Sequence, residues 1–263
     1  MKKGQTILYS ENLQIGYDSK KGKNVIASDI SISLNAGKLI ALIGANGIGK
    51  STLLRTLTGM QKPLSGNVFL NGSLISNFNP SELAQQLSIV LTDKLPESNL
   101  TVFELVALGR QPYTNWIGKL TSEDILKVNQ ALELTQISFL SDKKHYEISD
   151  GQLQKVMMAR ALAQDTPLII LDEPTTHLDL LHKVSLLKLL KKLALETNKS
   201  ILFSTHDLDL ALQLSDEMIV MNSNLLIQDA PENLIKNGIL NSLFDDENIF
   251  FDAEKAKFIF KNL

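Results

Sequence analysis

A glycine-rich segment that follows an apolar run constrains the fold of this chain more than any other feature. Residues 39–43 read Leu-Ile-Ala-Leu-Ile, and residues 44–51 read Gly-Ala-Asn-Gly-Ile-Gly-Lys-Ser, which fits the pattern G-x-x-x-x-G-K-[ST]. An uninterrupted apolar run of this length predicts a strand that is covered on both faces. Leu53, Leu54 and Leu57 fall on one face of a helix that begins after the loop. The order strand, glycine loop, helix predicts an α/β core with a phosphate-binding turn.

The residue types in this loop match what a phosphate group needs. Gly44, Gly47 and Gly49 allow backbone angles and close approach that a Cβ atom would hinder. Backbone N–H groups and the positive end of the following helix can therefore converge on an anion. We expect the Lys50 ammonium group to reach the β- and γ-phosphates of a nucleotide and the Ser51 hydroxyl to hold Mg²⁺. A chance match to the pattern is the alternative, and the flanking strand and helix weigh against it.

A second apolar run ends in two carboxylates. Residues 168–171 read Leu-Ile-Ile-Leu and are followed by Asp172 and Glu173. An aspartate at the carboxyl end of a buried strand, beside a phosphate loop, can hold Mg²⁺, and the next residue can act as a general base on a water molecule. An ordinary strand-to-loop turn is the alternative. The combination with the glycine loop favours the catalytic interpretation.

The rest of the chain predicts further strands and helices around this core. Alternation of apolar and polar residues predicts short antiparallel strands near the N-terminus, and capping residues before helically spaced apolar residues predict helices in the middle. The expected strands are 7–9, 13–17, 30–34, 68–70, 89–91, 201–204 and the hairpin 218–221 with 225–228; the expected helices are 82–86, 102–108 capped by Thr101, 122–134 capped by Ser122, 181–195 and 207–214, with a loop at 111–121. We interpret residues 81–160 as a largely helical insertion in an α/β core.

Composition excludes several classes of protein. The chain has 263 residues, no cysteine and a formal net charge of −3. Disulfides, cysteine–zinc sites and thiol catalysis are therefore excluded, and a strongly basic nucleic-acid binder is disfavoured. We expect no secretory signal at the N-terminus and no membrane-spanning segment, because no apolar run approaches ~18 residues. These features predict a soluble, cytosolic protein. The spacing of His145, His177 and His182 makes no convincing metal cluster.

Several motifs in a fixed order resemble those of the ATP-binding-cassette (ABC) ATPases. Residues 148–152, Ile-Ser-Asp-Gly-Gln, resemble the family signature L-S-G-G-Q, and residues 175–179, Thr-Thr-His-Leu-Asp, match the D-loop that follows the acidic strand. His206, within Thr-His-Asp, matches the switch histidine that contacts the γ-phosphate, and Tyr17, after a glycine, matches the aromatic residue that stacks on adenine. The resemblance extends over about residues 7–230.

This resemblance implies a fold and a set of site residues. The expected fold is α/β, a P-loop NTPase (RecA-like) core with an N-terminal antiparallel β subdomain and a helical insertion, known as the ABC ATPase fold. It is expected as a single domain over residues 1–263, with a helical subdomain at about 81–160 and a C-terminal extension at about 231–263. ATP and Mg²⁺ are the expected cofactors. The expected catalytic residues are Glu173 and His206; the nucleotide-binding residues are Tyr17, Gly44, Asn46, Gly47, Gly49, Lys50, Ser51, Thr52, Ser149, Gly151, Gln152 and Asp179; and the metal ligands are Ser51, Asp172 and Thr92.

Two positions depart from the family pattern. Asp150 stands where the signature has its first glycine. A carboxylate near the γ-phosphate would weaken binding by like-charge repulsion, so we expect it to point away or to meet a basic group. Thr92, followed by Asp93, stands where the family usually has a glutamine that contacts Mg²⁺ or the attacking water. Asp93 or a bridging water is the candidate substitute.

One stretch carries the signal for a branch of the family. Residues 101–113, Thr-Val-Phe-Glu-Leu-Val-Ala-Leu-Gly-Arg-Gln-Pro-Tyr, resemble the ATPases of iron-siderophore, heme and cobalamin importers. The resemblance implies a two-fold dimer in which Lys50 of one copy and Ser149 of the other complete each site. It also implies a peripheral location at the cytoplasmic face of the inner membrane, with transmembrane permease subunits and, indirectly, a substrate-binding protein as partners. The permease is expected to dock in a groove near residues 92–113, with four candidate contacts: Leu95, Pro96, Tyr113 and Trp116.

Two other functions stay open at this point. A soluble, non-transport ABC ATPase that remodels nucleic acid or ribosomes is disfavoured by the mild acidity, the single cassette and the lack of a coiled-coil insertion or basic tail, and we expect no nucleic-acid partner. The ATPase of an exporter is disfavoured only by residues 101–113. In residues 231–263 an initial helix, an acidic cluster and two aromatic stretches predict a packed C-terminal extension in preference to a regulatory site.

Overall fold

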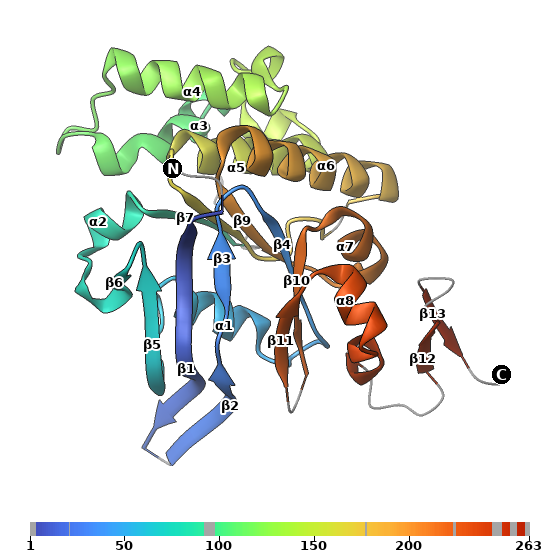
Figure 1. The fold of residues 1–263 in the computed structure, drawn as a ribbon. Helices are drawn as coiled ribbons and strands as arrows, with labels where there is room; N and C mark the ends of the chain where they lie inside the picture. Colours follow the sequence, from blue (N-terminus) through green and yellow to red (C-terminus); the bar gives the residue numbers. More distant parts are fainter. Residues whose placement is uncertain are drawn as a thin grey trace.

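The buried apolar runs of the sequence form one six-stranded sheet (Figure 1). The computed structural model describes residues 4–20, 22–91, 98–176, 178–222, 225–243, 249–252 and 257–260. The strands of the sheet, in the spatial order β11-β10-β4-β9-β8-β7, are β4 (Leu39–Ile43), β7 (Leu87–Val90), β8 (Leu168–Leu171), β9 (Ser200–Ser204), β10 (Glu217–Met221) and β11 (Leu226–Asp229). Neighbours pair in parallel, except that β10 and β11 are antiparallel. The carboxyl ends of β4, β9 and β8 therefore meet at one edge of the sheet.

Both faces of this sheet are covered, as the uninterrupted apolar run in β4 predicts. Leu39, Ala41 and Ile43 pack into a core shared with helices. Ile40 and Leu42 pack on the other face into a second core, which includes the leucines of α1 (Lys50–Leu57). Every residue of β4 is buried, so the strand holds the start of the glycine loop rigidly.

An antiparallel sheet encloses α1 from the other side, which confirms the expected N-terminal β subdomain. Its strand order is β2-β1-β5-β6, with β3 paired to β1. The strands are β1 (Thr6–Ser19), β2 (Gly22–Ile30), β3 (Ser33–Asn35), β5 (Ser65–Leu70) and β6 (Ser73–Leu74). The expected strand at 30–34 is wrong in its bounds, because β2 ends at Ile30 and β3 begins at Ser33. The exposed first residues of β2 pair with β1 without any apolar alternation that would have predicted them.

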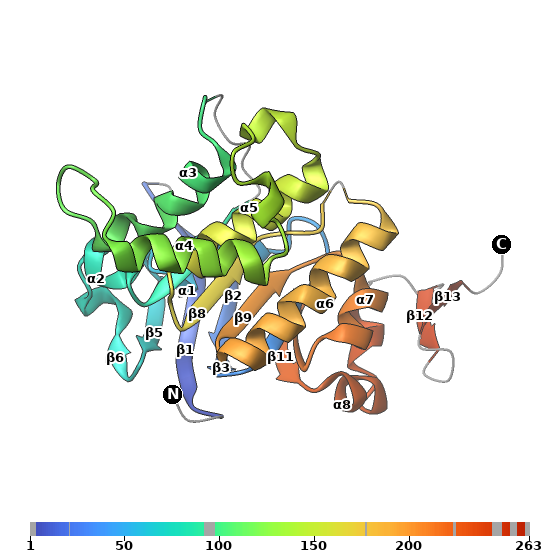
Figure 2. The same ribbon diagram turned by 90° about the horizontal axis from the view of Figure 1, so that it is seen from above.

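Helices form the layer on the opposite face of the six-stranded sheet. Figure 2 shows α3, α4 and α5 gathered on one side of this layer and α6 and α7 on the other. The segment between β6 and β8 holds η1 (Ile75–Asn77), α2 (Pro80–Ala84), α3 (Val102–Ala107), η2 (Leu108–Tyr113), α4 (Ser122–Leu134), η3 (Ser138–Leu140), η4 (His145–Glu147) and α5 (Asp150–Ala163); α6 (Leu180–Thr197) and α7 (Leu208–Leu214) follow later. Residues 87–90 form β7 of the core sheet, so the helical insertion proper begins after this strand.

A buried ion pair stabilises the helical insertion, and its contacts explain which residue types occur at positions 109–113. Arg110 Nε lies 2.9 Å from Asp124 Oδ1, with both side chains buried, and Arg110 Nη1 donates to Ala163 O at 2.8 Å. The Tyr113 ring lies against the guanidinium group, 3.9 Å from its carbon atom to the ring centroid. A Cβ on Gly109 would lie 2.3 Å from Arg160 O, so only glycine fits there. These residues hold η2 against α4 and α5.

The expected cap of α4 is wrong by one residue. Thr121, and not Ser122, caps the helix: its side chain accepts from Asp124 N, and the Asp124 carboxylate accepts from Thr121 N. Thr121 is followed by an acid at the third helical position, which completes a reciprocal capping box. The expected loop at 111–121 is also shorter, because η2 extends to Tyr113.

The expected permease groove near residues 92–113 lies partly outside the described residues and stays a prediction. The start of α3 is tied to the α4–α5 connection, because Val102 N donates to Lys143 O at 2.8 Å and His145 N donates to Leu100 O at 3.3 Å. Tyr113 ends η2, which follows α3, and Trp116 lies in the loop that leads from η2 to α4. Two other expected contacts, Leu95 and Pro96, lie outside the described residues.

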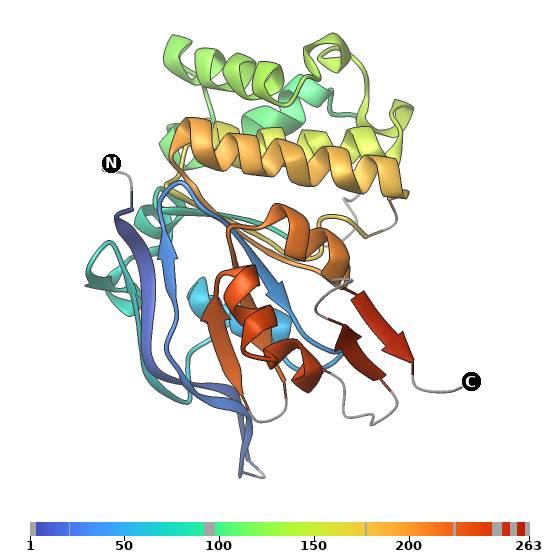
Figure 3. The same cartoon turned by 45° about the vertical axis from the view of Figure 1, so that its right-hand side comes forward.

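The C-terminal segment continues beyond the sheet edge that β11 forms. It contains α8 (Pro231–Lys236), η5 (Ile239–Leu243) and a two-stranded hairpin of β12 (Ile249–Asp252) and β13 (Lys257–Phe260); Figures 1 and 3 show α8 beside β11. The buried side chain of Phe251 joins the larger core, and its backbone N–H donates to Asn241 Oδ1 at 2.7 Å. None of the helices in the described ranges has both the length and the apolarity to cross a membrane.

Candidate functional site

The glycine loop joins β4 to α1 at the carboxyl edge of the six-stranded sheet. A Cβ on Gly44 would lie 2.5 Å from Met221 O, and one on Gly49 would lie 2.4 Å from Ile26 Cγ2, so close packing requires both glycines. Gly47 has open space around it but a φ of +74°, which favours glycine for its backbone angle. No side chain caps the N-terminus of α1. Its first N–H groups are therefore available to an anion.

Lys50 folds back over this loop. Its Nζ donates to Gly44 O at 2.9 Å and to Ala45 O at 3.1 Å, and the residue is only 6% exposed. Burial lowers the pKa of Lys50 from its ordinary value, while the nearby carboxylates of Glu173 and Asp172 act to raise it. The ammonium group thus lies within electrostatic range of both acids that end β8.

Accessible groups surround the loop. Asn46, Gly47 and Ser51 are exposed, so the groups that the sequence assigns to nucleotide and metal can be reached from solvent. Thr52 is buried, and its Oγ1 lies 3.1 Å from the hydroxyl of Tyr17. This hydrogen bond ties the expected adenine-stacking ring to the first turn of α1.

The backbone beside Tyr17 is held in turn by its neighbours. Tyr17 itself is 46% exposed, which leaves ring area for stacking. A Cβ on Gly16 would lie 2.1 Å from Asn24 O, so glycine is needed where β1 meets β2. Gln61 Nε2 donates to Gly16 O at 2.5 Å. Position and exposure of the ring therefore both fit a base-stacking platform.

The two acids follow the end of β8, beside the end of the adjacent strand β9. Asp172 N donates to Val90 O at 2.9 Å, which continues the pairing of β7 with β8. Ser204, the last residue of β9, donates its hydroxyl to Asp172 Oδ1 at 2.6 Å and accepts from Glu173 N at 2.8 Å. Glu173 has a φ of +48°, an uncommon backbone angle for a residue with a side chain. Thr176 Oγ1 donates to Glu173 Oε2 at 3.2 Å.

The histidine after β9 contacts the second acid. His206 Nε2 is hydrogen-bonded to Glu173 Oε1. The next residue, Asp207, accepts from Lys183 Nζ at 3.0 Å and donates its N–H to Thr205 Oγ1 at 3.0 Å. Residues 205–207 are therefore bonded to α6 through Lys183 and to the end of β8 through Glu173.

The signature segment forms the N-terminus of α5. Ser149 is the N-cap, with its side chain accepting from Gln152 N, and Gln152 Oε1 accepts from Ser149 N at 3.0 Å. Gly151 lies beneath His182, whose Cδ2 atom would be 3.1 Å from a Cβ there. Asp150 is exposed and forms no ion pair with any other described residue. Of the two expected alternatives, a basic partner is not found among the described residues, and an orientation away from the nucleotide stays a prediction.

The D-loop leads into α6 through a second capped N-terminus. Asp179 Oδ1 accepts from His182 N at 2.9 Å and lies 2.8 Å from His182 Nδ1. Hydrogen bonds from the backbone and side chain of His182 lower the pKa of Asp179. Leu180 and Leu181 are 65% and 81% exposed. His177, within the same motif, lies outside the described residues.

The structure thus divides the expected residues into two groups. The glycine loop, Lys50, the two acids and His206 meet at the carboxyl edge of the sheet. The signature belongs to α5, which packs against α3, α4 and β7, whereas α1 packs against β1. Thr92, one of the expected metal ligands, lies outside the described residues.

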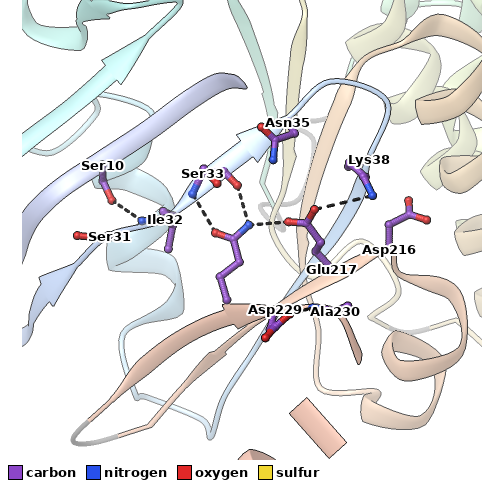
Figure 4. A pocket seen from close by; sticks show the side chains of 11 residues that line it. Ser10, Ser31, Ile32, Ser33, Asn35, Lys38, Asp216, Glu217, Asp229 and Ala230 are labelled. Atoms are coloured by element: carbon purple, nitrogen blue, oxygen red, sulfur yellow. Dashed lines mark hydrogen bonds and ion pairs between the residues drawn. The ribbon is translucent and has the colours of Figure 1, made fainter. Parts of the chain in front are cut away.

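A cavity of about 270 Å³ lies beside the glycine loop. Its lining residues come from the end of β4 and the glycine loop, from the segment that joins β9 to α7, and from η5: Ile43, Gly44, Ala45, Asn46, Thr205, His206, Leu208 and Leu243. A larger cavity, of about 620 Å³, lies at the start of β4 and β10, at the opposite end of the sheet (Figure 4). Its polar groups bond one another: Gln228 bonds Ser33 and Glu217, and Asp216 accepts from Leu39 N. The residues that line the larger cavity therefore connect the two sheets by hydrogen bonds.

Three contacting residues were missed by reading the sequence. Ser204 bonds to the site residues Asp172 and Glu173, whereas Lys183 and Gln61 bond to Asp207 and Gly16, which are neighbours of site residues. These bonds depend on strand register, helix position and loop path, none of which a sequence pattern displays. Ser204 had one weak signal, since it lies two residues before His206 in a segment already assigned to a strand end. Lys183 and Gln61 had none.

Comparisons with known proteins agree with this geometry. A sequence model of the family described as ABC transporter matches residues 27–176. The iron(3+)-hydroxamate import ATP-binding protein FhuC of Bacillus subtilis is 40% identical over 252 residues, which are 95% of this chain and 92% of that protein. The achromobactin transport ATP-binding protein CbrD of Dickeya dadantii is 39% identical over 243 residues, 91% of this chain and 88% of that protein.

Solved structures share the fold over nearly the whole chain. An ATP-binding cassette of an ABC transporter, in its ADP conformation, superposes with a TM-score of 0.78 at 28% identity, covering 90% of this chain and 96% of that one. A chain assigned to a metal-chelate type ABC transporter in an inward-facing conformation gives a TM-score of 0.79 at 28% identity, covering 97% of this chain and 96% of that one. Both span the two sheets and the helical layer together.

Proposed function

This chain belongs to the ABC transporter family of ATP-binding proteins, and from that membership we propose that its ATP hydrolysis drives the import of an iron chelate of the ferric-siderophore class. Family membership makes the chain an ATP-binding, ATP-hydrolysing transporter subunit. The single observation that supports a complete hydrolytic centre is the meeting of Lys50, Glu173 and His206 at one edge of the sheet.

The chemistry follows from the charges at this edge. ATP hydrolysis needs a base for the attacking water and positive or hydrogen-bonding groups around the γ-phosphate. Glu173 supplies a carboxylate that can accept the proton of the water. Lys50 and His206 supply groups that stabilise charge on the transferring phosphoryl oxygens. The uncapped N-terminus of α1 holds the β-phosphate through its N–H groups.

The donor set fits Mg²⁺. The described residues contain no cluster of three or more His, Cys, Asp or Glu that could hold a metal without help. Ser51 and Asp172 offer a hydroxyl and a carboxylate, and Mg²⁺ commonly takes one or two protein oxygens together with phosphate oxygens and water. When bound, Mg²⁺ neutralises charge on the β- and γ-phosphate oxygens. Thr92 stays a proposed third ligand.

We propose that two copies enclose each ATP. Ser149, Gly151 and Gln152 begin a 14-residue helix, and an exposed helix N-terminus favours an anion. Because α5 and α1 belong to different packed layers, the helix of a second copy is the proposed source of these donors. The exposed Leu180 and Leu181, beside Asp179, supply apolar surface that such a pairing would cover.

The transported substrate and the partners come from the relatives. Those named for iron(3+)-hydroxamate and achromobactin transport cover more than nine-tenths of this chain, and the chelate class is carried over from them. As an import ATPase the chain works with permease subunits. We propose a substrate-binding protein as an indirect partner and a peripheral position at the cytoplasmic face of the membrane.

The test separates hydrolysis from transport. Glu173→Gln keeps the shape of the side chain and removes the base, so the variant is expected to bind ATP and to hydrolyse it at least ~100-fold more slowly. Cells that lack the gene are expected to lose uptake of radiolabelled ferric siderophore, with recovery from the wild-type gene and none from the Glu173→Gln gene. Wild-type ATP turnover by Glu173→Gln would contradict the assigned base. Unchanged uptake in the deleted cells would contradict the substrate class.

A further inference from the structure

We propose that Ser204 is a positioning residue that sets both acids of the hydrolytic centre through a single hydroxyl; this inference rests on the function proposed above. Ser204 ends β9 and is fully buried. Its hydroxyl bridges two consecutive residues of the neighbouring strand end, donating to Asp172 Oδ1 at 2.6 Å and accepting from Glu173 N at 2.8 Å.

The register of β9 with its neighbouring strands places the Ser204 hydroxyl beside Asp172 and Glu173. Leu171 of β8 is opposite Phe203 of β9, so the next residues, Asp172 and Ser204, leave their strands side by side. On its other side Ser204 is opposite Leu42 of β4, two residues before the glycine loop. The serine therefore lies between the strand that carries the acids and the strand that carries the phosphate-binding loop.

The polarity of this bridge is fixed by its partners. A carboxylate oxygen can only accept and a backbone N–H can only donate, so the serine proton is committed to Asp172 and a serine lone pair to Glu173. One carboxylate oxygen of Asp172 is thereby occupied. The other, Oδ2, has no hydrogen-bond partner among the described residues, which leaves it to a cation.

The second bond restrains an unusual backbone. Glu173 has a φ of +48°, a left-handed angle that a residue with a Cβ seldom adopts without surrounding constraint. Its N–H is bonded to Ser204 and its C=O accepts from Thr176 N at 3.1 Å. The hydrogen bond to the serine hydroxyl is one of the two backbone hydrogen bonds that restrain the φ angle of Glu173. This angle sets the direction in which the Glu173 side chain leaves the strand end.

A matched control exists on the same strand. Ser200 begins β9, is also fully buried, and its hydroxyl has no hydrogen-bond partner in the described structure. Ser200→Ala and Ser204→Ala delete the same atom from the same strand. Only the second deletion removes bonds to the acids, so any difference in catalysis between the two variants reports on those bonds.

The experiment compares Ser204→Ala, Ser200→Ala and Ser204→Cys, the last of which keeps a polar atom at the position of the hydroxyl and weakens the hydrogen bonds. Each variant is checked by thermal unfolding, and its affinity for the fluorescent analogue TNP-ATP is measured with and without Mg²⁺, alongside kcat. For Ser204→Ala and Ser204→Cys we expect kcat to fall roughly tenfold to a hundredfold. Their affinity without Mg²⁺ is expected to stay within about twofold of the wild type, and the gain in affinity on adding Mg²⁺ is expected to shrink. Ser200→Ala is expected to match the wild type in all three measurements.

Wild-type kcat and Mg²⁺ response in folded Ser204→Ala or Ser204→Cys would overturn the inference, as would an equal loss in Ser200→Ala. Should Ser204→Ala fail to fold, the Ser204→Cys variant decides. The proposed function is judged separately by Glu173→Gln. A Glu173→Gln variant without hydrolysis, beside fully active Ser204 variants, would remove only the role of Ser204.

Discussion

His206 and Glu173 are hydrogen-bonded to each other through Nε2 and Oε1, although 33 residues separate them in the chain. The contact arises because β8 and β9 are parallel neighbours and each side chain follows the end of its strand. A group assigned to the γ-phosphate thus contacts the carboxylate assigned to the attacking water. Any nucleotide that engages the histidine acts on the base as well.

This pairing predicts the outcome of removing the imidazole. His206→Ala deletes one donor to the phosphate and the partner of Glu173, so ATP hydrolysis is expected to fall by roughly 10²–10³-fold. ATP affinity, which rests on the glycine loop and Lys50, is expected to change less than about threefold. Steady-state ATPase assays and equilibrium binding of TNP-ATP measure the two effects. Turnover within a few-fold of the wild type would count against the role of His206.

Tyr17 allows stacking and hydrogen bonding to be separated. Tyr17→Phe keeps the ring and loses only the hydrogen bond to Thr52. Because this hydrogen bond is partly exposed, its net contribution is at most about 0.5–1.5 kcal/mol. Tyr17→Ala also loses the ring. We expect ATP affinity to fall no more than about tenfold in the first variant and by a clearly larger factor in the second. Equal losses in both would assign the effect to the hydroxyl and not to stacking.

The buried ion pair of the helical insertion predicts a stability effect without a direct catalytic cause. Arg110→Ala leaves the buried carboxylate of Asp124 without its cation, which is expected to lower the free energy of unfolding by about 3–5 kcal/mol. The matched control is Arg55→Ala, because Arg55 is exposed on α1 and its loss is expected to cost less than ~0.5 kcal/mol. Urea unfolding of both variants measures the difference. Equal stability of the two variants would contradict the structural role of the pair.

The same carboxylate predicts a dependence of stability on pH. Burial works to raise the pKa of Asp124, but hydrogen bonds from Thr121 and Arg110 outweigh it, and the net pKa lies below the ordinary value of 3.8. Below pH 3.8 the unfolded chain takes up the proton first, so the stabilisation is complete above that pH and is lost as the pH falls through the folded pKa. Asp124→Asn is expected to flatten the acid side of the stability profile by up to about 1.4 kcal/mol per pH unit. An unchanged profile would show that Asp124 has the same pKa in both states.

Local patterns in the sequence predicted those elements whose cause is local. The apolar runs of β4 and β8 gave their bounds directly, since buried parallel strands need apolar residues on both faces. The N-cap Thr101 was predicted for α3 and is present, where it forms a capping box with Glu104. The family model and the solved relatives confirm the fold that the ordered motifs implied.

Features that depend on contacts between residues distant in the chain could not be predicted from the sequence. Strand β2 and the β12–β13 hairpin are held by pairing with strands whose register no local pattern reveals. The contact of the Tyr113 ring with Arg110 could not be predicted, because it depends on how η2 packs against the helices around it, and the role of Tyr113 in a permease groove stays a prediction. The roles of Asp150, Thr92 and the residues assigned to the nucleotide stay predictions.

The central claim is that Lys50 of one copy and Ser149 of another complete each ATP site, and a mixture of two inactive variants tests it most directly. Lys50→Ala removes the phosphate-binding cation and Ser149→Arg blocks the helix N-terminus, so each variant alone is expected to lack ATPase activity. A heterodimer of the two contains one site with both groups intact. An equimolar mixture that has exchanged subunits is therefore expected to recover up to about a quarter of wild-type activity. No recovery in a mixture shown to contain heterodimers would contradict the shared site.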